Sequence, residues 1–181
     1  RGLARPARRP TNAGMTAPAP SEIFVPTDRG RLYVKTWTPP AAAGAPILLF
    51  HDSLGCVALW RGFPAALAVA TGRPVIAYDR LGFGRSDRRD DRLTPDFVAQ
   101  EGAAAPALLR AALGEGRFVA FGHSVGGGMA AQVGATFGPR CEAVVCVSSL
   151  AFVDERGRAG IRRESAAFTA PGGLDRLARH H

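Results

Sequence analysis

The chain has 181 residues, of which 46% are hydrophobic and 21% are charged, a composition typical of a globular domain and not of a disordered chain. Its longest apolar runs, such as residues 46–50 and 143–147, are far too short to cross a bilayer. The net charge of +8 lies mainly at the ends, because residues 1–14 carry +4 and residues 155–181 carry +3. A nucleic-acid face normally covers the folded body, so we expect neither a nucleic-acid nor a membrane partner.

The first residues differ in composition from the body. Residues 1–14 are rich in Arg, Pro and Ala, contain no acid, and are followed directly by Met15. The segment has two interpretations: translated sequence upstream of a start at Met15, or an acid-poor organelle transit segment. We expect a disordered leader over residues 1–20. The protein is expected to be cytoplasmic, or organellar if the leader is a transit segment.

Cysteine usage gives no sign of a metal centre. Cys56, Cys141 and Cys146 are odd in number and have neither metal-ligand nor disulfide spacing. They predict buried free thiols in a reducing compartment. We therefore expect no bound metal, and no motif of the chain calls for a cofactor.

The body alternates strands and helices in chain order. Two β-rich stretches, residues 23–25 and 31–37, flank a turn signal at 28–30 and predict a hairpin. Short apolar runs typical of strands buried on both faces lie at residues 46–50, 74–78, 117–121 and 142–147. Helices are expected between them, at residues 60–70, 94–113 (with Thr94 as N-cap) and 125–137. The pattern predicts an α/β fold with a mainly parallel sheet, an antiparallel N-terminal hairpin and helices on both faces.

One motif indicates chemistry. Gly122-His123-Ser124-Val125-Gly126 stands between a predicted strand and a predicted helix, which is the setting that G-x-S-x-G requires. The two glycines permit a sharp turn that exposes the Ser124 hydroxyl, and the helix N-terminus directs free N–H groups toward it. We predict that Ser124 is a nucleophile and that the Val125 N–H is an oxyanion donor. The alternative is a glycine-rich turn with a capping serine.

A second motif, His51-Asp52-Ser53-Leu54-Gly55, follows the first buried strand. This loop is expected to face the Ser124 turn and to supply the second oxyanion donor, the backbone N–H of Ser53. His51 has two interpretations: a catalytic base, or a histidine that braces its loop through hydrogen bonds.

Three apolar residues near these motifs are candidates for a substrate pocket. They are Leu54, Trp60 and Phe83. Each is equally consistent with packing in the core.

Three motifs in this order resemble the α/β-hydrolase fold family: HDSLG (51–55), DRLGFGRSD (79–87) and GHSVGG (122–127). The similarity is to its capped, cofactor-independent serine hydrolase branch and covers about residues 21–181. It implies acyl transfer through Ser124 on an ester, thioester or activated C–C bond of a small molecule, and a structural role for the loop at 79–87. The chain departs from the family at Asp52, where the family usually has glycine.

The resemblance also implies an acid and then a histidine downstream of the nucleophile. The downstream histidines are His180 and His181, and residues 151–181 read as the start of a helical cap after a core at 21–150. We therefore expect a C-terminally truncated member, inactive because the triad acid and histidine are missing. The alternative is a non-catalytic binding protein of the same fold. The sequence does not indicate an oligomeric state.

Overall fold

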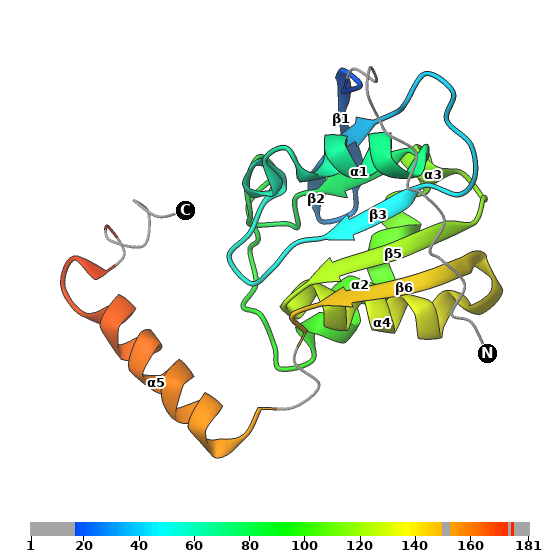
Figure 1. The fold of residues 1–181 in the computed structure, drawn as a ribbon. Helices are drawn as coiled ribbons and strands as arrows, with labels where there is room; N and C mark the ends of the chain where they lie inside the picture. The colour runs from blue at the N-terminus through cyan, green and yellow to red at the C-terminus, as the bar shows by residue number, and fades with distance from the viewer. Residues whose placement is uncertain (1–16, 150–152, 174, 176–181) are drawn as a thin grey trace, which may run out of the picture.

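A computed structural model describes residues 17–149, 153–173 and 175. Its six strands form one mixed sheet in the order β1-β2-β4-β3-β5-β6 (Figure 1). The strands are β1 (Pro20–Thr27), β2 (Gly30–Trp37), β3 (Ile47–Phe50), β4 (Val75–Tyr78), β5 (Phe118–His123) and β6 (Cys141–Val147). The pairs β1/β2 and β2/β4 are antiparallel, whereas β3/β4, β3/β5 and β5/β6 are parallel. The predicted fold class is confirmed.

The N-terminal hairpin closes through a two-residue turn. Thr27 pairs with Gly30, and the Thr27 hydroxyl donates to the Gly30 carbonyl at 2.6 Å. Gly30 has a φ of 125°, which suits a residue without Cβ. The turn signal at residues 28–30 therefore predicted the hairpin correctly.

Alternate side chains of the central strands enter two separate apolar clusters. Leu48 and Phe50 pack on the face covered by α2 (Phe97–Leu108) and α4 (Val125–Phe137). Ile47 and Leu49 pack on the opposite face, beneath α1 (Phe63–Thr71). Burial on both faces explains why the strand reads as an unbroken apolar run.

Two helix boundaries differ from the prediction. Trp60 belongs to the short 3₁₀ helix η1 (Val57–Trp60), and α1 begins only at Phe63, where Pro64 suits the first turn. The helix expected to start after Thr94 begins at Phe97. Thr94 is not its cap, because it lies three residues before the first residue of α2, and its hydroxyl donates to the Asp96 carboxylate.

The same helix also ends earlier than expected. It contains Pro106, which has no N–H to donate. The chain leaves α2 after Leu108 and turns at Leu109 before α3 (Arg110–Leu113). The single helix predicted over residues 94–113 is thus two helices.

Strand β6 forms one edge of the sheet, after η2 (Gly138–Arg140). Val144, Val145 and Val147 are 41%, 38% and 40% exposed. The three cysteines are free, as expected, but the prediction that they are buried is wrong, because Cys146 is exposed and Cys56 and Cys141 are half-buried. The apolar run of β6 resembles that of a central strand, which is why the sequence suggested burial.

Helix α5 (Glu155–Thr169) stands apart from the sheet (Figure 1). It begins earlier than the predicted Ala159, because the Asp154 carboxylate accepts from the Gly157 N–H at 2.7 Å and caps the helix. The second expected cap helix, from residue 173, and most of the predicted leader lie outside the described residues. Among the helices that are described, none is long and apolar enough to span a membrane.

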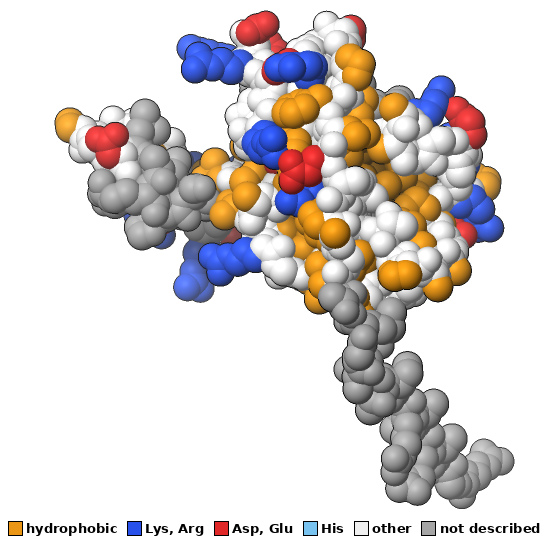
Figure 2. Space-filling model, turned by 90° about the horizontal axis from the view of Figure 1, so that it is seen from above, with side chains coloured by type: hydrophobic (Ala, Val, Ile, Leu, Met, Phe, Trp, Pro, Cys, Tyr) orange, Lys and Arg blue, Asp and Glu red, His pale blue; other side chains and the backbone are white. Residues whose placement is uncertain are grey.

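Charges are mixed on the face seen in Figure 2. Lys and Arg side chains lie beside Asp and Glu and between hydrophobic groups, without a continuous basic surface on this face.

Candidate active site

Ser124 lies between the last residue of β5 and the first residue of α4. Its backbone has φ 53° and ψ −122°, a conformation that costs an L-residue on the order of 1–3 kcal/mol. The surrounding chain holds it there: the Ser124 N–H donates to the Val147 carbonyl at 2.9 Å, and the Ser124 carbonyl accepts from the Gly127 N–H at 3.0 Å. The serine therefore sits on a sharp, strained strand-to-helix turn, here called the elbow (residues 122–126).

The two glycines of the elbow are required by close backbone packing. A Cβ on Gly122 would overlap the carbonyl group of Gly126. A Cβ on Gly126 would overlap the carbonyl oxygen of Phe50 and lie 2.6 Å from that of His51. The obstacles are backbone atoms of α4 for Gly122 and of the end of β3 for Gly126, so they cannot move aside as a flexible side chain would. The elbow thus packs directly against the neighbouring strand.

The pairing of β3 with β5 brings the second motif to the elbow. Phe50 pairs with Gly122 in a parallel register, so the chain leaves both strands at the same edge of the sheet. The loop that follows β3 (residues 51–55, the oxyanion loop) carries the exposed Ser53. The predicted donors, the N–H groups of Ser53 and Val125, therefore lie on segments that flank one edge.

His51 is 2% exposed and its ring nitrogens are occupied. Nδ1 lies 2.9 Å from the Asp52 carbonyl oxygen, and Nε2 accepts from the N–H and Nε–H of Arg80 at 3.3 and 3.2 Å. Burial, together with the Arg80 charge, lowers the pKa of His51 to about 4. Of its two interpretations, this geometry favours the loop brace, because a neutral ring with both nitrogens engaged is poorly suited to accept a serine proton.

Arg80 organises the oxyanion loop, and sequence reasoning missed it. Its guanidinium is buried and donates to the carbonyl oxygens of Asp52 at 2.8 Å and Ser53 at 3.2 Å. Phe83 covers it, with the guanidinium carbon 4.2 Å from the ring centroid. The only signal for this role was the position of Arg80 directly after a buried strand, within the DRLGFGRSD motif.

Asp79, Ser86 and Asp87 of that motif have structural contacts, as the resemblance implied. The buried Asp79 carboxylate accepts from the backbone N–H groups of Val57 at 2.6 Å and Arg85 at 2.8 Å. The Ser86 hydroxyl donates to the Asp79 carbonyl at 2.6 Å. Asp87 pairs with Arg31 at 2.9 Å.

A cavity of about 260 Å³ lies beside the elbow. Asp52, which stands where the family usually has glycine, faces it together with His123, and the distance between Asp52 Oδ2 and His123 Nδ1 is 3.6 Å. The cavity is lined by His51, Asp52, Gly55, Cys56, Leu59, Trp60 and His123.

The three predicted pocket residues do not share one cavity. Trp60 lines the cavity beside the elbow. Leu54 lines a separate space of about 920 Å³ between the oxyanion loop and α5, opposite Ile161 and Phe168. Phe83 packs on Arg80 and on the His51 ring, 5.4 Å between centroids. Within the described part of the chain, no three His, Cys, Asp or Glu side chains form a cluster that could hold a metal ion.

Residues 45–180 match a model of the alpha/beta hydrolase fold family. The chain belongs to this family.

Two curated relatives are similar to part of the chain. The Homo sapiens protein named 1-acylglycerol-3-phosphate O-acyltransferase ABHD5 is 32% identical over 107 residues, which cover 59% of this chain and 30% of that protein. The Bos taurus (Lyso)-N-acylphosphatidylethanolamine lipase is 25% identical over 125 residues, 69% of this chain and 36% of that protein. The matches thus span about a third of the length of these relatives.

Solved structures share the fold. A carboxylesterase from Bacillus subtilis superposes with a TM-score of 0.66 at 20% identity, covering 87% of this chain and 52% of the other. The proline iminopeptidase of Mycobacterium smegmatis gives 0.60 at 27% identity, covering 88% and 59%.

Proposed function

We propose that this chain carries the nucleophile and the oxyanion donors of a serine hydrolase. In the proposed reaction, Ser124 Oγ forms a bond to the acyl carbon and the leaving alcohol or thiol departs with a proton. The N–H groups of Ser53 and Val125 stabilise the oxyanion, each contributing about 2.7–4 kcal/mol to lowering the barrier. Water then releases the acid. The strained backbone of Ser124 between two glycines is the observation that carries this proposal.

The proposed substrate is a small molecule with an ester, thioester or activated C–C bond. The names of the two curated relatives, an O-acyltransferase and a lipase, favour an acyl ester among these three substrate classes. We further propose that residues 21–150 form the catalytic core and that residues 151–181 begin a cap over it. Nucleic acid and membrane are not among the proposed partners.

No histidine that the structure describes is suited to act as the base. Burial, together with the Arg80 charge, holds His51 neutral, and within the described residues no hydrogen bond joins the His123 ring to the Ser124 hydroxyl. None of the described histidines therefore fits the base that the resemblance implies, and we propose that this chain acylates without efficient turnover.

A fluorophosphonate probe with mass-spectrometric mapping tests the nucleophile. Imidazole is added as an external base, and exposed Ser21 serves as the internal control. We expect Ser124 to be labelled at least about tenfold faster than Ser21, because an oxyanion site alone retains substantial catalysis. Ser124→Ala should remove that label while leaving Ser21 labelling unchanged.

Equal labelling of Ser124 and Ser21 would contradict the proposal. It would favour the alternative, a non-catalytic small-molecule binding protein that keeps the fold and the cavity beside the elbow.

A further inference from the structure

A second polar cavity lies between β2, η1 and the loop after β4. Its volume is about 280 Å³. None of its lining residues belongs to the elbow or to the oxyanion loop. Its charged groups come from three separate segments: Glu22 and Lys35 from the hairpin, Arg61 from the end of η1, and Asp79 and Arg85 from the loop after β4.

Two of the cations share a single carboxylate. Lys35 Nζ lies 2.9 Å from one oxygen of Glu22, and Arg85 Nη1 lies 2.7 Å from the other. The hydrogen bond from Lys35, and then that from Arg85, lower the pKa of Glu22 to about 2. Glu22 is thus ionised at neutral pH and balances one of the cavity's three positive charges, and with the Asp79 carboxylate counted as well one positive charge remains in excess.

The other carboxylate of the cavity is already engaged. Both oxygens of Asp79 accept backbone N–H groups, from Val57 and Arg85. Asp79 thus holds the loop in place. Within the described residues, its carboxylate forms no hydrogen bond or ion pair with another side chain.

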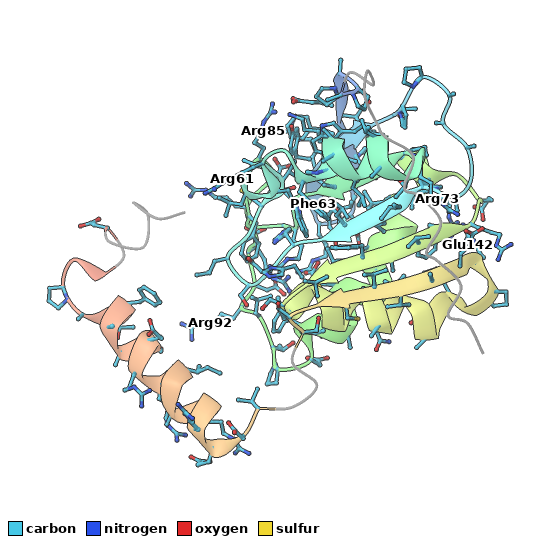
Figure 3. All side chains as sticks on the ribbon, viewed as in Figure 1. Arg61, Phe63, Arg73, Arg85, Arg92 and Glu142 are labelled. Carbon is cyan, nitrogen blue, oxygen red and sulfur yellow. The ribbon has the colours of Figure 1, made fainter. Side chains whose placement is uncertain are left out.

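Arg61 adds a cation at a position where an arginine is costly. Its backbone has φ 51° and ψ −125°, nearly the conformation of Ser124, and such strain persists mainly where function requires it. In the part of the chain that the structure describes, its guanidinium makes neither an ion pair nor a hydrogen bond. Arg61 and Arg85 project from the same side of the molecule (Figure 3).

Aromatic rings hold the other two cations in place. The Arg85 guanidinium carbon is 4.2 Å from the Tyr33 ring centroid, and Lys35 Nζ is 5.7 Å from the centroid of Trp37. Ring contacts of this kind order long side chains without using all their N–H donors. The cavity therefore offers pre-positioned donors together with an uncompensated positive charge.

We propose that this cavity binds a phosphate group, with Arg61 as its principal ligand and Lys35 and Arg85 as additional donors. The planar guanidinium of Arg61 matches two phosphate oxygens at once. Binding would offset the excess positive charge and would explain an arginine in a conformation that favours glycine. The site is independent of Ser124 and of the proposed hydrolase activity.

The test is a titration of the ¹⁵N-labelled chain with inorganic phosphate at constant ionic strength, followed by amide chemical shifts. We expect saturable shifts at residues 33–35, 61 and 84–85, and much weaker ones with acetate. Phenyl phosphate in a parallel titration identifies the source of the group: tighter binding indicates an organic monoester, and equal binding indicates free phosphate. The absence of saturable shifts with either phosphate overturns the proposal.

Three variants distinguish a specific phosphate site from nonspecific electrostatic binding to a positively charged protein. Arg61→Gln should weaken phosphate binding about tenfold or more, whereas Arg92→Gln, at an exposed arginine (Figure 3), should leave it unchanged. Arg61→Gly should lose binding yet raise the melting temperature, because glycine relieves the strain. Binding that survives in Arg61→Gly, an equal loss in Arg92→Gln, or a lower melting temperature in Arg61→Gly contradicts the proposal.

Discussion

The position of the oxyanion loop depends on whether the buried ring of His51 is protonated. In the folded protein the ring is neutral and accepts from Arg80, an arrangement that a protonated ring could not keep. The sequence left its role open, since a histidine after a strand suits both a base and a brace. Only its neighbours distinguish the two, and the decisive neighbour, Arg80, lies 29 positions away.

This ring predicts a pH dependence of stability. The folded pKa of His51 is about 4 and the ordinary value is 6.5, so the unfolded chain binds the proton first. The stabilisation is complete above pH 6.5 and is lost as the pH falls to 4, amounting to roughly 3 kcal/mol. Urea unfolding at a series of pH values should show this loss.

Two histidine variants make the measurement specific. His51→Gln keeps an acceptor for Arg80 but cannot titrate, so its free energy of unfolding should vary less between pH 6.5 and 4. His123→Gln, at a side chain that is 43% exposed, should follow the unchanged chain. If the free energy of unfolding of the unchanged chain does not vary across this interval, burial of His51 does not control the pH dependence of stability.

Residue-scale prediction succeeded where backbone geometry dictates the residue. The role of the two elbow glycines could be recognised from the sequence, because no other residue fits a position where a Cβ would overlap a carbonyl group. Arg80 was missed because a buried arginine looks like a surface residue until its acceptors are known. Phe83 was assigned to a pocket for the same reason, since it packs on Arg80.

At the scale of elements, strand β6 is an exposed edge. In the described structure it pairs with β5 alone, and three of its valines are about two-fifths exposed. Such an edge is a template for pairing with another chain. We predict concentration-dependent association of this chain, measured by light scattering.

A charge on that edge should suppress the association. Val145→Lys is expected to shift the scattering toward the monomer, because an edge lysine opposes strand addition. Ile161→Lys, at a 59% exposed position on α5, removes a comparable apolar side chain without touching the sheet and should have little effect. If the unchanged chain stays monomeric at all concentrations, the edge is not a docking template.

Strands were more predictable than helix boundaries. The sequences of β3 and β4 are apolar without interruption because both faces of each strand are covered, and the sequence shows this directly. The start of α2 depends instead on local contacts just before the helix, where the Thr94 hydroxyl donates to the Asp96 carboxylate and the Thr94 carbonyl accepts from the Phe97 N–H. The exposure of β6 depends on its place in the sheet order, which the sequence of the strand does not encode.

At the scale of the whole molecule, the fold places the proposed nucleophile, Ser124, and both proposed donor segments on one edge of the sheet. The described residues offer no suitable base, so acylation and turnover should separate. We predict that the 181-residue chain hydrolyses p-nitrophenyl acetate only at the rate of its Ser124→Ala variant when no external base is present. Robust turnover that disappears in Ser124→Ala would show that this chain holds a working base.

The position of β3 and β5 in the sheet has a mechanical consequence. Each is flanked by a strand on both sides, and central strands open only with large-scale unfolding, whereas edges fray readily. The carbonyl of Phe50 also packs closely against Gly126. Fraying of β1 would therefore leave the spacing between Ser124 and the oxyanion loop unchanged, whereas fraying of β6 would release the Ser124 N–H from the Val147 carbonyl.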